Sequence, residues 1–280
     1  MPVYLAYDGS INASWISRYA VRMAANHPER RLNIIYIEDA AVPAPALEAG
    51  LRRVEFEAQA VGVTAEVMIR PMRQGVPGGL IDAIPEGPET FIVCGTRVKM
   101  GRRGLLRGTI SERLLRLRRY NVIAIRVVQP GLLGLPGNLL APVSGDPRGF
   151  QAGIPMLSLM ARDIRLLHLL HVLETKRSRF SLMPEAANAR KLAGAMGYIR
   201  GIEADLLDKL PIDPARVDSH VRMADNWTRE TIVQAARLHA GLIFVEAPIL
   251  GLIGRFGFGD AHERLLADSP CDVAVYRGAV

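Results

Sequence analysis

The residues with the most evident chemical potential lie in a glycine-rich loop that runs from Gly95 to Thr109 and is followed by Ser111. Glycine lets backbone N–H groups approach an anion, and the two hydroxyls add donors at the positive end of a following helix. The loop therefore predicts a phosphate cradle. The competing interpretation is a surface loop in which glycine provides turns and arginine provides solubility.

Other reactive side chains form no comparable set. Among the six histidines only His168 and His171 lie close together, and on a strand they face opposite sides, so we expect no metal site. Cys94 and Cys271 are predicted to be core residues. The sequence has no Gly-x-Ser-x-Gly elbow, and the loop lacks the Gly-Lys-[Ser/Thr] ending of a Walker motif. We therefore expect no catalytic residues and at most a weak ATPase.

Alternating apolar strands and amphipathic helices position the loop. The predicted strands are Val3–Tyr7, Leu32–Ile37, Thr64–Arg70, Thr90–Cys94 and Asn121–Val127. Four helices are predicted between these strands. The first follows the turn at Ser10 and ends near Ala25, the second spans about Ala46–Val61, a short third begins at Gly75, and the fourth spans about Thr109–Arg119. This alternation predicts a parallel sheet of five strands with helices on both faces.

The same pattern starts again after a Pro/Gly hinge. The second set of strands is Asn138–Val143, Ile164–His171, Val217–Met223, Gly241–Val245 and Asp272–Tyr276, and its helices are Gly153–Met160, Pro184–Leu210 and Thr228–Leu238. Glu-Arg-Leu-Leu occurs at Glu112–Leu115 and again at Glu263–Leu266. One duplicated unit explains the length. We predict domains at residues 1–130 and 138–280, joined by a linker at 131–137.

Composition favours an ordinary globular protein, because 49% of the residues are hydrophobic and 22% are charged. The first residues do not form a signal peptide, and Glu246 and Pro248 interrupt the most apolar segment, so we expect a cytoplasmic protein without a membrane span. The net charge is +7, and nine basic residues between Arg97 and Arg119 accompany a single acid. This patch should attract polyanions. Nucleic acid is disfavoured because no aromatic side chains interleave with the arginines, whereas an acidic protein partner stays open.

Four motifs together resemble the universal stress protein family in a tandem, two-domain form. They are Tyr7-Asp8-Gly9-Ser10, Tyr36-Ile37-Glu38-Asp39, Gly75-Val76-Pro77 and the glycine-rich loop. In the nucleotide-binding branch of that family the loop reads Gly, two residues, Gly, nine residues, Gly, then Ser or Thr. Here Gly95 and Gly108-Thr109 fit, and Val98 stands at the second glycine.

The resemblance implies a flavodoxin- or Rossmann-like fold, of the adenine nucleotide alpha hydrolase type, that binds ATP, with Mg²⁺ as its counter-ion, at the carboxyl ends of the strands. The residues carried over to the nucleotide site are Asp8, Ser10, Ile37, Gly95, Arg97, Gly108, Thr109 and Ser111. Asp8 would meet the ribose or adenine, and the backbone near Ile37 would line the adenine pocket. Arg97 is assigned to a phosphate from its charge alone, and Val98 places a side chain where the backbone should approach phosphate.

The second half departs further from this pattern. Glu246 and Asp260 replace residues that would face phosphate, and the loop between them is mostly apolar. We therefore expect no ATP there and assign this half a structural role within an intramolecular pair. Whether the chain also forms a homodimer stays open. The alternative function is a nucleotide-free scaffold that docks an acidic partner through the basic loop and helix at 97–119.

Overall fold

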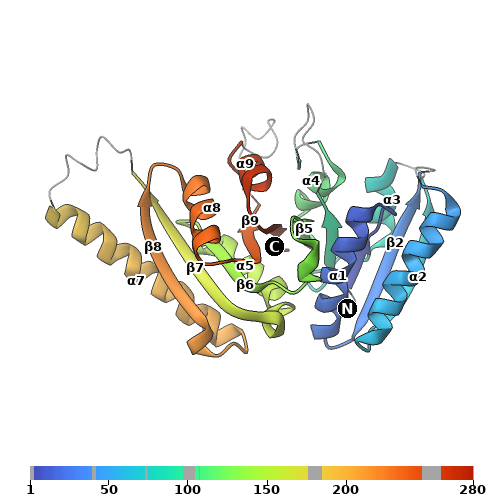
Figure 1. Cartoon of the computed structure of the whole chain (residues 1–280), viewed down its shortest axis with the longest axis horizontal. Helices are drawn as coiled ribbons and strands as arrows, with labels where there is room; N and C mark the ends of the chain where they lie inside the picture. The colour runs from blue at the N-terminus through green and yellow to red at the C-terminus, as the bar shows by residue number, and fades with distance from the viewer. Residues whose placement is uncertain are drawn as a thin grey trace.

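The computed structural model describes residues 3–39, 42–72, 75–96, 105–106, 108–175, 185–247 and 260–279. Within them, ten strands form one continuous sheet in the order β3-β2-β1-β4-β5-β10-β9-β6-β7-β8 (Figure 1). The first five strands belong to the first repeat and the last five to the second. Each repeat has the same internal strand order, which agrees with a duplicated α/β unit.

Among its described residues, the first repeat has five parallel strands and four α-helices. Its strands are β1 (Val3–Ala6), β2 (Arg31–Glu38), β3 (Thr64–Pro71), β4 (Phe91–Gly95) and β5 (Asn121–Arg126). Its helices are α1 (Ile11–Asn26), α2 (Ala44–Ala60), α3 (Gly75–Ala83) and α4 (Ile110–Leu115). β1 pairs with both β2 and β4, so the first strand lies in the middle of its half, as expected for this class.

The second repeat has the same organisation. Its strands are β6 (Gly137–Val143), β7 (Ile164–Glu174), β8 (Val217–Ala224), β9 (Leu242–Glu246) and β10 (Asp272–Arg277). Its helices are α5 (Pro147–Ser158), α7 (Glu185–Lys209), α8 (Trp227–Arg237) and α9 (Asp260–Asp268). The predicted fold class, two repeated five-stranded α/β units, is confirmed.

The two repeats join through their last strands. β5 and β10 pair antiparallel, with Ala124 opposite Val275, while the other strand pairs are parallel. This pairing turns two five-stranded sheets into one sheet of ten strands, which the sequence does not predict. At this junction the Asp272 carboxylate accepts hydrogen bonds from the Val128 and Gln129 amides and, at 2.7 Å, from the Tyr19 hydroxyl.

Helices cover both faces of the sheet. Side chains of α1, α2, α5 and α7 pack into the core on one face, and those of α3, α4, α8 and α9 pack on the other. Cys94 and Cys271 are buried in the second of these cores, as predicted. No helix among the described residues is long and apolar enough to cross a membrane.

Three local features differ from the expectation or refine it. α5 begins at Pro147 and not at Gly153, because Asp146 accepts a hydrogen bond from the Arg148 amide and so caps the helix. α4 ends at Leu115 and not near Arg119. The Pro/Gly hinge packs against α1 at Gly134, whose φ is +76° and where a Cβ would lie 2.7 Å from the carbonyl carbon of Arg18.

Candidate functional site

A cavity of about 200 Å³ lies at the carboxyl ends of β1, β2 and β4. Four of the predicted nucleotide residues line it: Asp8, Ile37, Gly95 and Ser111. They come from four separate segments of the first repeat, and the parallel sheet brings them together because its strand ends share one edge. The volume is below the roughly 300–1,000 Å³ of typical ligand pockets, so the cavity by itself is too small to enclose a drug-sized ligand.

The Thr96 side chain gives this cavity an available polar group. Its hydroxyl is buried and has no hydrogen-bond partner among the described residues. A buried hydroxyl without a partner is costly, and a ligand that supplies one removes the cost. Asn12 donates to the Thr96 carbonyl at 3.4 Å, which holds the end of β4 against α1.

Gly95 has a packing reason to be glycine. A Cβ at this position would lie 2.5 Å from the Cδ1 atom of Ile16 and 3.2 Å from the Asn12 side chain. The close approach of β4 to α1 therefore accounts for this residue within the protein itself. This explanation was not available from the loop motif.

Three other predicted site residues, Ser10, Gly108 and Thr109, are not among those that line the cavity. Ser10 caps α1 by accepting from the Ala13 amide at 3.1 Å, and Thr109 caps α4 by accepting from the Glu112 amide. The Thr109 and Ser111 hydroxyls are hydrogen-bonded at 2.9 Å, so Thr109 contacts a residue that lines the cavity but does not line it itself. Arg97, like Val98, lies outside the described residues.

The Gly108 amide already donates a hydrogen bond to a carboxylate. Glu112, which is 5% exposed, accepts from the Gly108 N–H at 2.5 Å and pairs with Arg116 at 2.8 Å. Gly108 has a φ of +72°, a conformation that favours glycine. A phosphate that uses this N–H must compete with Glu112, so the Gly108 amide, one of the predicted phosphate donors, already has an acceptor.

A second carboxylate crosses between the repeats. Glu263 of α9 accepts hydrogen bonds from the amides of Leu105, at 2.6 Å, and Leu106, at 3.0 Å. Both leucines are buried. The chain just before the first repeat's Gly108-Thr109 pair is thus anchored by a residue of the second repeat.

The second repeat has a larger cavity, of about 430 Å³, at the ends of β6, β7 and β9. Its lining combines aromatic and titratable side chains: Phe150, Trp227, Tyr276, His171, His262 and Glu246. Ser111 and His262 hold the same place relative to Glu-Arg-Leu-Leu, one residue before the glutamate. A hydroxyl in one cavity is therefore replaced by an imidazole in the other.

Glu246 fills the position of Gly95 and makes the second cavity acidic. Its carboxylate lies so close to Gly149 that a Cβ there would be 1.7 Å away, and Arg277 is 3.6 Å from it. Burial raises the pKa of Glu246, while Arg277 lowers it. Burial also lowers the pKa of His262, whose Nε2 lies 2.9 Å from the Glu246 carbonyl oxygen.

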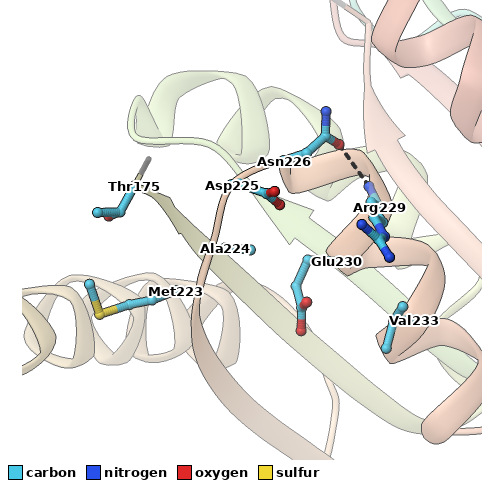
Figure 2. A pocket seen from close by; sticks show the side chains of 8 residues that line it. All are labelled: Thr175, Met223, Ala224, Asp225, Asn226, Arg229, Glu230 and Val233. Atoms are coloured by element: carbon cyan, nitrogen blue, oxygen red, sulfur yellow. Dashed lines mark hydrogen bonds between the residues drawn. The ribbon is translucent and has the colours of Figure 1, made fainter. Parts of the chain in front are cut away.

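A third depression of about 370 Å³ lies at the turn between β8 and α8 (Figure 2). Two of its polar side chains make hydrogen bonds with residues of α8. Asn226 accepts from the Arg229 amide at 2.9 Å, and Glu230 accepts from Gln234 at 2.6 Å. These contacts account for Asn226 and Glu230 without a ligand.

The basic helix is partly neutralised. Arg113, Arg116 and Arg119 are exposed, but Arg116 pairs with Glu112 and Arg119 pairs with Glu86. Residues 97–104 and 107 of the basic loop lie outside the described residues. The described part of the patch therefore offers a partner less free charge than the sequence indicates.

His168, Asp218 and His220 form a cluster that was not predicted from the sequence. His168 and His171 point to opposite faces, as predicted, since the His171 ring contacts Tyr198 of α7 whereas His168 contacts His220 of β8. The available signal was Asp218-Ser219-His220, which places two ligand-type side chains on one face of a strand. The pairing of that strand with β7 could not be read from the sequence.

The fold and its cavities define a tandem α/β protein whose candidate sites lie at the carboxyl ends of parallel strands. Among solved structures, the whole chain resembles a universal stress protein from Archaeoglobus fulgidus, with 16% identity, a TM-score of 0.62, and coverage of 99% of this chain and 96% of that one. A putative universal stress protein from Pseudomonas aeruginosa gives the same identity and TM-score, with 99% and 93% covered.

The same architecture occurs in the cytoplasmic domain of a prokaryotic cation chloride cotransporter, at 12% identity and a TM-score of 0.60, with 99% of this chain and 95% of that one covered. No protein-family model matches the sequence, and no curated protein matches it. The chain therefore has the universal stress protein fold over its whole length, which confirms the resemblance noted in the sequence at the level of fold.

Proposed function

We propose that this chain is an adenine-nucleotide-binding protein of the universal stress type, in which the first repeat binds ATP or AMP and the second repeat is a structural partner. It acts through binding and release, not through efficient catalysis. The observation that carries the proposal is the cavity at the ends of β1, β2 and β4, where Asp8, Ile37, Gly95 and Ser111 converge.

The chemistry of this cavity suits the adenosine portion of a nucleotide. Ile37 contributes apolar surface for the base, Asp8 contributes an acceptor for ribose hydroxyls, and the Thr96 hydroxyl lacks a partner among the described residues. The phosphates would extend toward Gly108 and Thr109. Because Glu112 holds the Gly108 amide, phosphate binding requires this carboxylate to move.

The difference between the repeats supports nucleotide in the first one. Glu246 lies in the second cavity where Gly95 lies in the first, and a carboxylate repels phosphate. Its raised pKa reduces that repulsion only if the group takes up a proton. The two acids that line the first cavity, Asp8 and Asp39, follow β1 and β2, whereas the proposal assigns the phosphates to the segment that begins α4.

Calorimetric titration of ATP, AMP and adenosine into the full chain, with Mg²⁺ present, tests the proposal. We expect saturable binding of one nucleotide per chain. Asp8→Ala should weaken it by about 10–150-fold, because a hydrogen bond to a charged group contributes about 1.5–3 kcal/mol. The matched control is Asp146→Ala, which changes the equivalent first-turn aspartate of the second repeat and should leave the affinity unchanged.

Absence of saturable binding at millimolar ATP refutes the proposal and leaves the scaffold that docks an acidic partner as the better account of the basic loop. Equal loss of affinity in Asp8→Ala and Asp146→Ala would refute the assignment of binding to the first repeat. If adenosine binds as tightly as ATP, the phosphate role of Gly108 and Thr109 is wrong while the adenosine site stands.

A further inference from the structure

The cluster of His168, Asp218 and His220 lies on the two outermost strands of the second repeat. β7 and β8 run side by side at the end of the sheet opposite β3 (Figure 1). In their parallel register His168 is paired with Asp218, and His220 is two residues further along β8. Because side chains alternate along a strand, Asp218 and His220 share a face, and the register brings His168 to the same face.

Three donor atoms of this cluster converge. His168 Nδ1 lies 3.2 Å from His220 Nε2, Asp218 Oδ2 lies 3.2 Å from His220 Nε2, and Asp218 Oδ2 lies 3.8 Å from His168 Nδ1. Three atoms at these separations have a common point roughly 2.0 Å from each, which matches zinc bond lengths of about 2.0–2.2 Å to imidazole nitrogen and carboxylate oxygen.

A histidine or aspartate binds a metal as a neutral imidazole or an ionised carboxylate, and the cluster holds two imidazoles and one carboxylate. The charged side chains that act on the two imidazoles are Asp218, which favours a cation here, and Arg222, which opposes one but donates a hydrogen bond to the Val221 carbonyl.

We propose that His168, Asp218 and His220 bind one divalent transition-metal ion, with Zn²⁺ the best match, and that this ion ties the edge strand β8 to β7. Two imidazoles and one carboxylate are a ligand set that zinc uses in proteins. The side chain of Asp218 is 59% exposed whereas those of His168 and His220 are 7% and 14% exposed, so solvent reaches the cluster from the aspartate side. A water can therefore complete four-coordination.

The site is separate from the proposed nucleotide function. It belongs to the second repeat and uses none of the residues that line the first cavity. The same three side chains without metal make a hydrogen bond between the two rings, in which one nitrogen must carry a proton and the other must not. A metal ion bound to both nitrogens would replace this hydrogen bond. An experiment that detects the ion therefore distinguishes a metal site from a hydrogen-bonded pair of histidines.

The experiment titrates Zn²⁺, without nucleotide, into the full chain after removal of metal by a chelator. Calorimetry gives stoichiometry and affinity, and Co²⁺ added in place of Zn²⁺ reports tetrahedral ligation through its visible absorption. We expect one ion per chain and a thermal midpoint that rises with Zn²⁺. His220→Gln should weaken binding by at least about tenfold, since loss of even an outer partner of a metal ligand costs about 10–100-fold.

Asp218→Asn is a second variant that changes an exposed side chain and should also weaken binding. His239→Asn is the matched control, because it removes an exposed histidine that is not part of the cluster and because asparagine tolerates the positive φ of 49° at that position. Absence of stoichiometric Zn²⁺ binding to the wild-type chain would overturn the proposal. Equal Zn²⁺ affinity in wild type, His220→Gln and Asp218→Asn would overturn it as well.

Discussion

The contact of Glu263 with the first repeat gives the sharpest prediction about how the two halves depend on each other. Glu263→Ala removes the acceptor of two amides, those of the buried residues Leu105 and Leu106. A buried donor left without its partner costs about 1–3 kcal/mol, so two of them predict a loss of roughly 2–6 kcal/mol in the free energy of unfolding. At about 2–4 °C per kcal/mol, the melting temperature should fall by roughly 4–24 °C.

Urea titration followed by circular dichroism, together with calorimetry, measures this loss. Glu263→Gln keeps one acceptor oxygen and should lose less than Glu263→Ala. Arg264→Ala is the matched control on the same helix, because Arg264 is exposed and surface substitutions of this kind change stability by no more than about 0.5 kcal/mol. If Glu263→Ala is as stable as Arg264→Ala, the anchoring of the first repeat by the second is refuted.

Three further substitutions test the junction, the second cavity and its acid sensitivity. Tyr19→Phe removes the buried hydrogen bond to Asp272 at 2.7 Å and should cost about 1.5–3 kcal/mol in urea unfolding, and a change below about 0.5 kcal/mol would contradict the role given to this bond. Gly153→Ala places a Cβ 2.4 Å from the buried Tyr276 ring and should cost about 1–3 kcal/mol by calorimetry, and a variant as stable as the wild type would contradict this tight packing. Burial lowers the pKa of His262 in the folded chain, so as pH falls the unfolded chain binds a proton at this residue first. The stability that neutral His262 contributes is therefore present above about pH 6.5 and is lost as pH falls toward the folded pKa. Urea titration at each pH should show that the free energy of unfolding falls less between pH 7 and 5 in His262→Gln than in the wild type.

Much of the fold could be predicted because it depends on local periodicity. The apolar runs that end at Cys94 and Val245 are buried strands, and Ser10 and Thr109 cap the helices that follow their turns. These features depend on which faces neighbouring residues bury and on short-range hydrogen bonds, so residues close in sequence specify them. The repeated Glu-Arg-Leu-Leu segment extended the same inference to the second half.

The candidate nucleotide site could be predicted only in part. Asp8, Ile37, Gly95 and Ser111 line one cavity because parallel strands end at one edge of the sheet, a rule that the order of elements already supplies. The rule did not indicate that Glu112 would occupy the Gly108 amide, because that contact depends on the direction of one side chain.

What the sequence alone determined is the α/β class, the duplication and the segments that meet at the strand ends. Only the tertiary structure decided how the repeats join through β5 and β10, why Glu263 reaches Leu105, and that His168 meets His220 across two strands. The physical reason is the separation along the sequence of the residues that interact. Periodicity and capping act within a few residues, whereas strand register and the contacts between repeats join residues tens to hundreds of positions apart, and only the packing of the whole chain selects them.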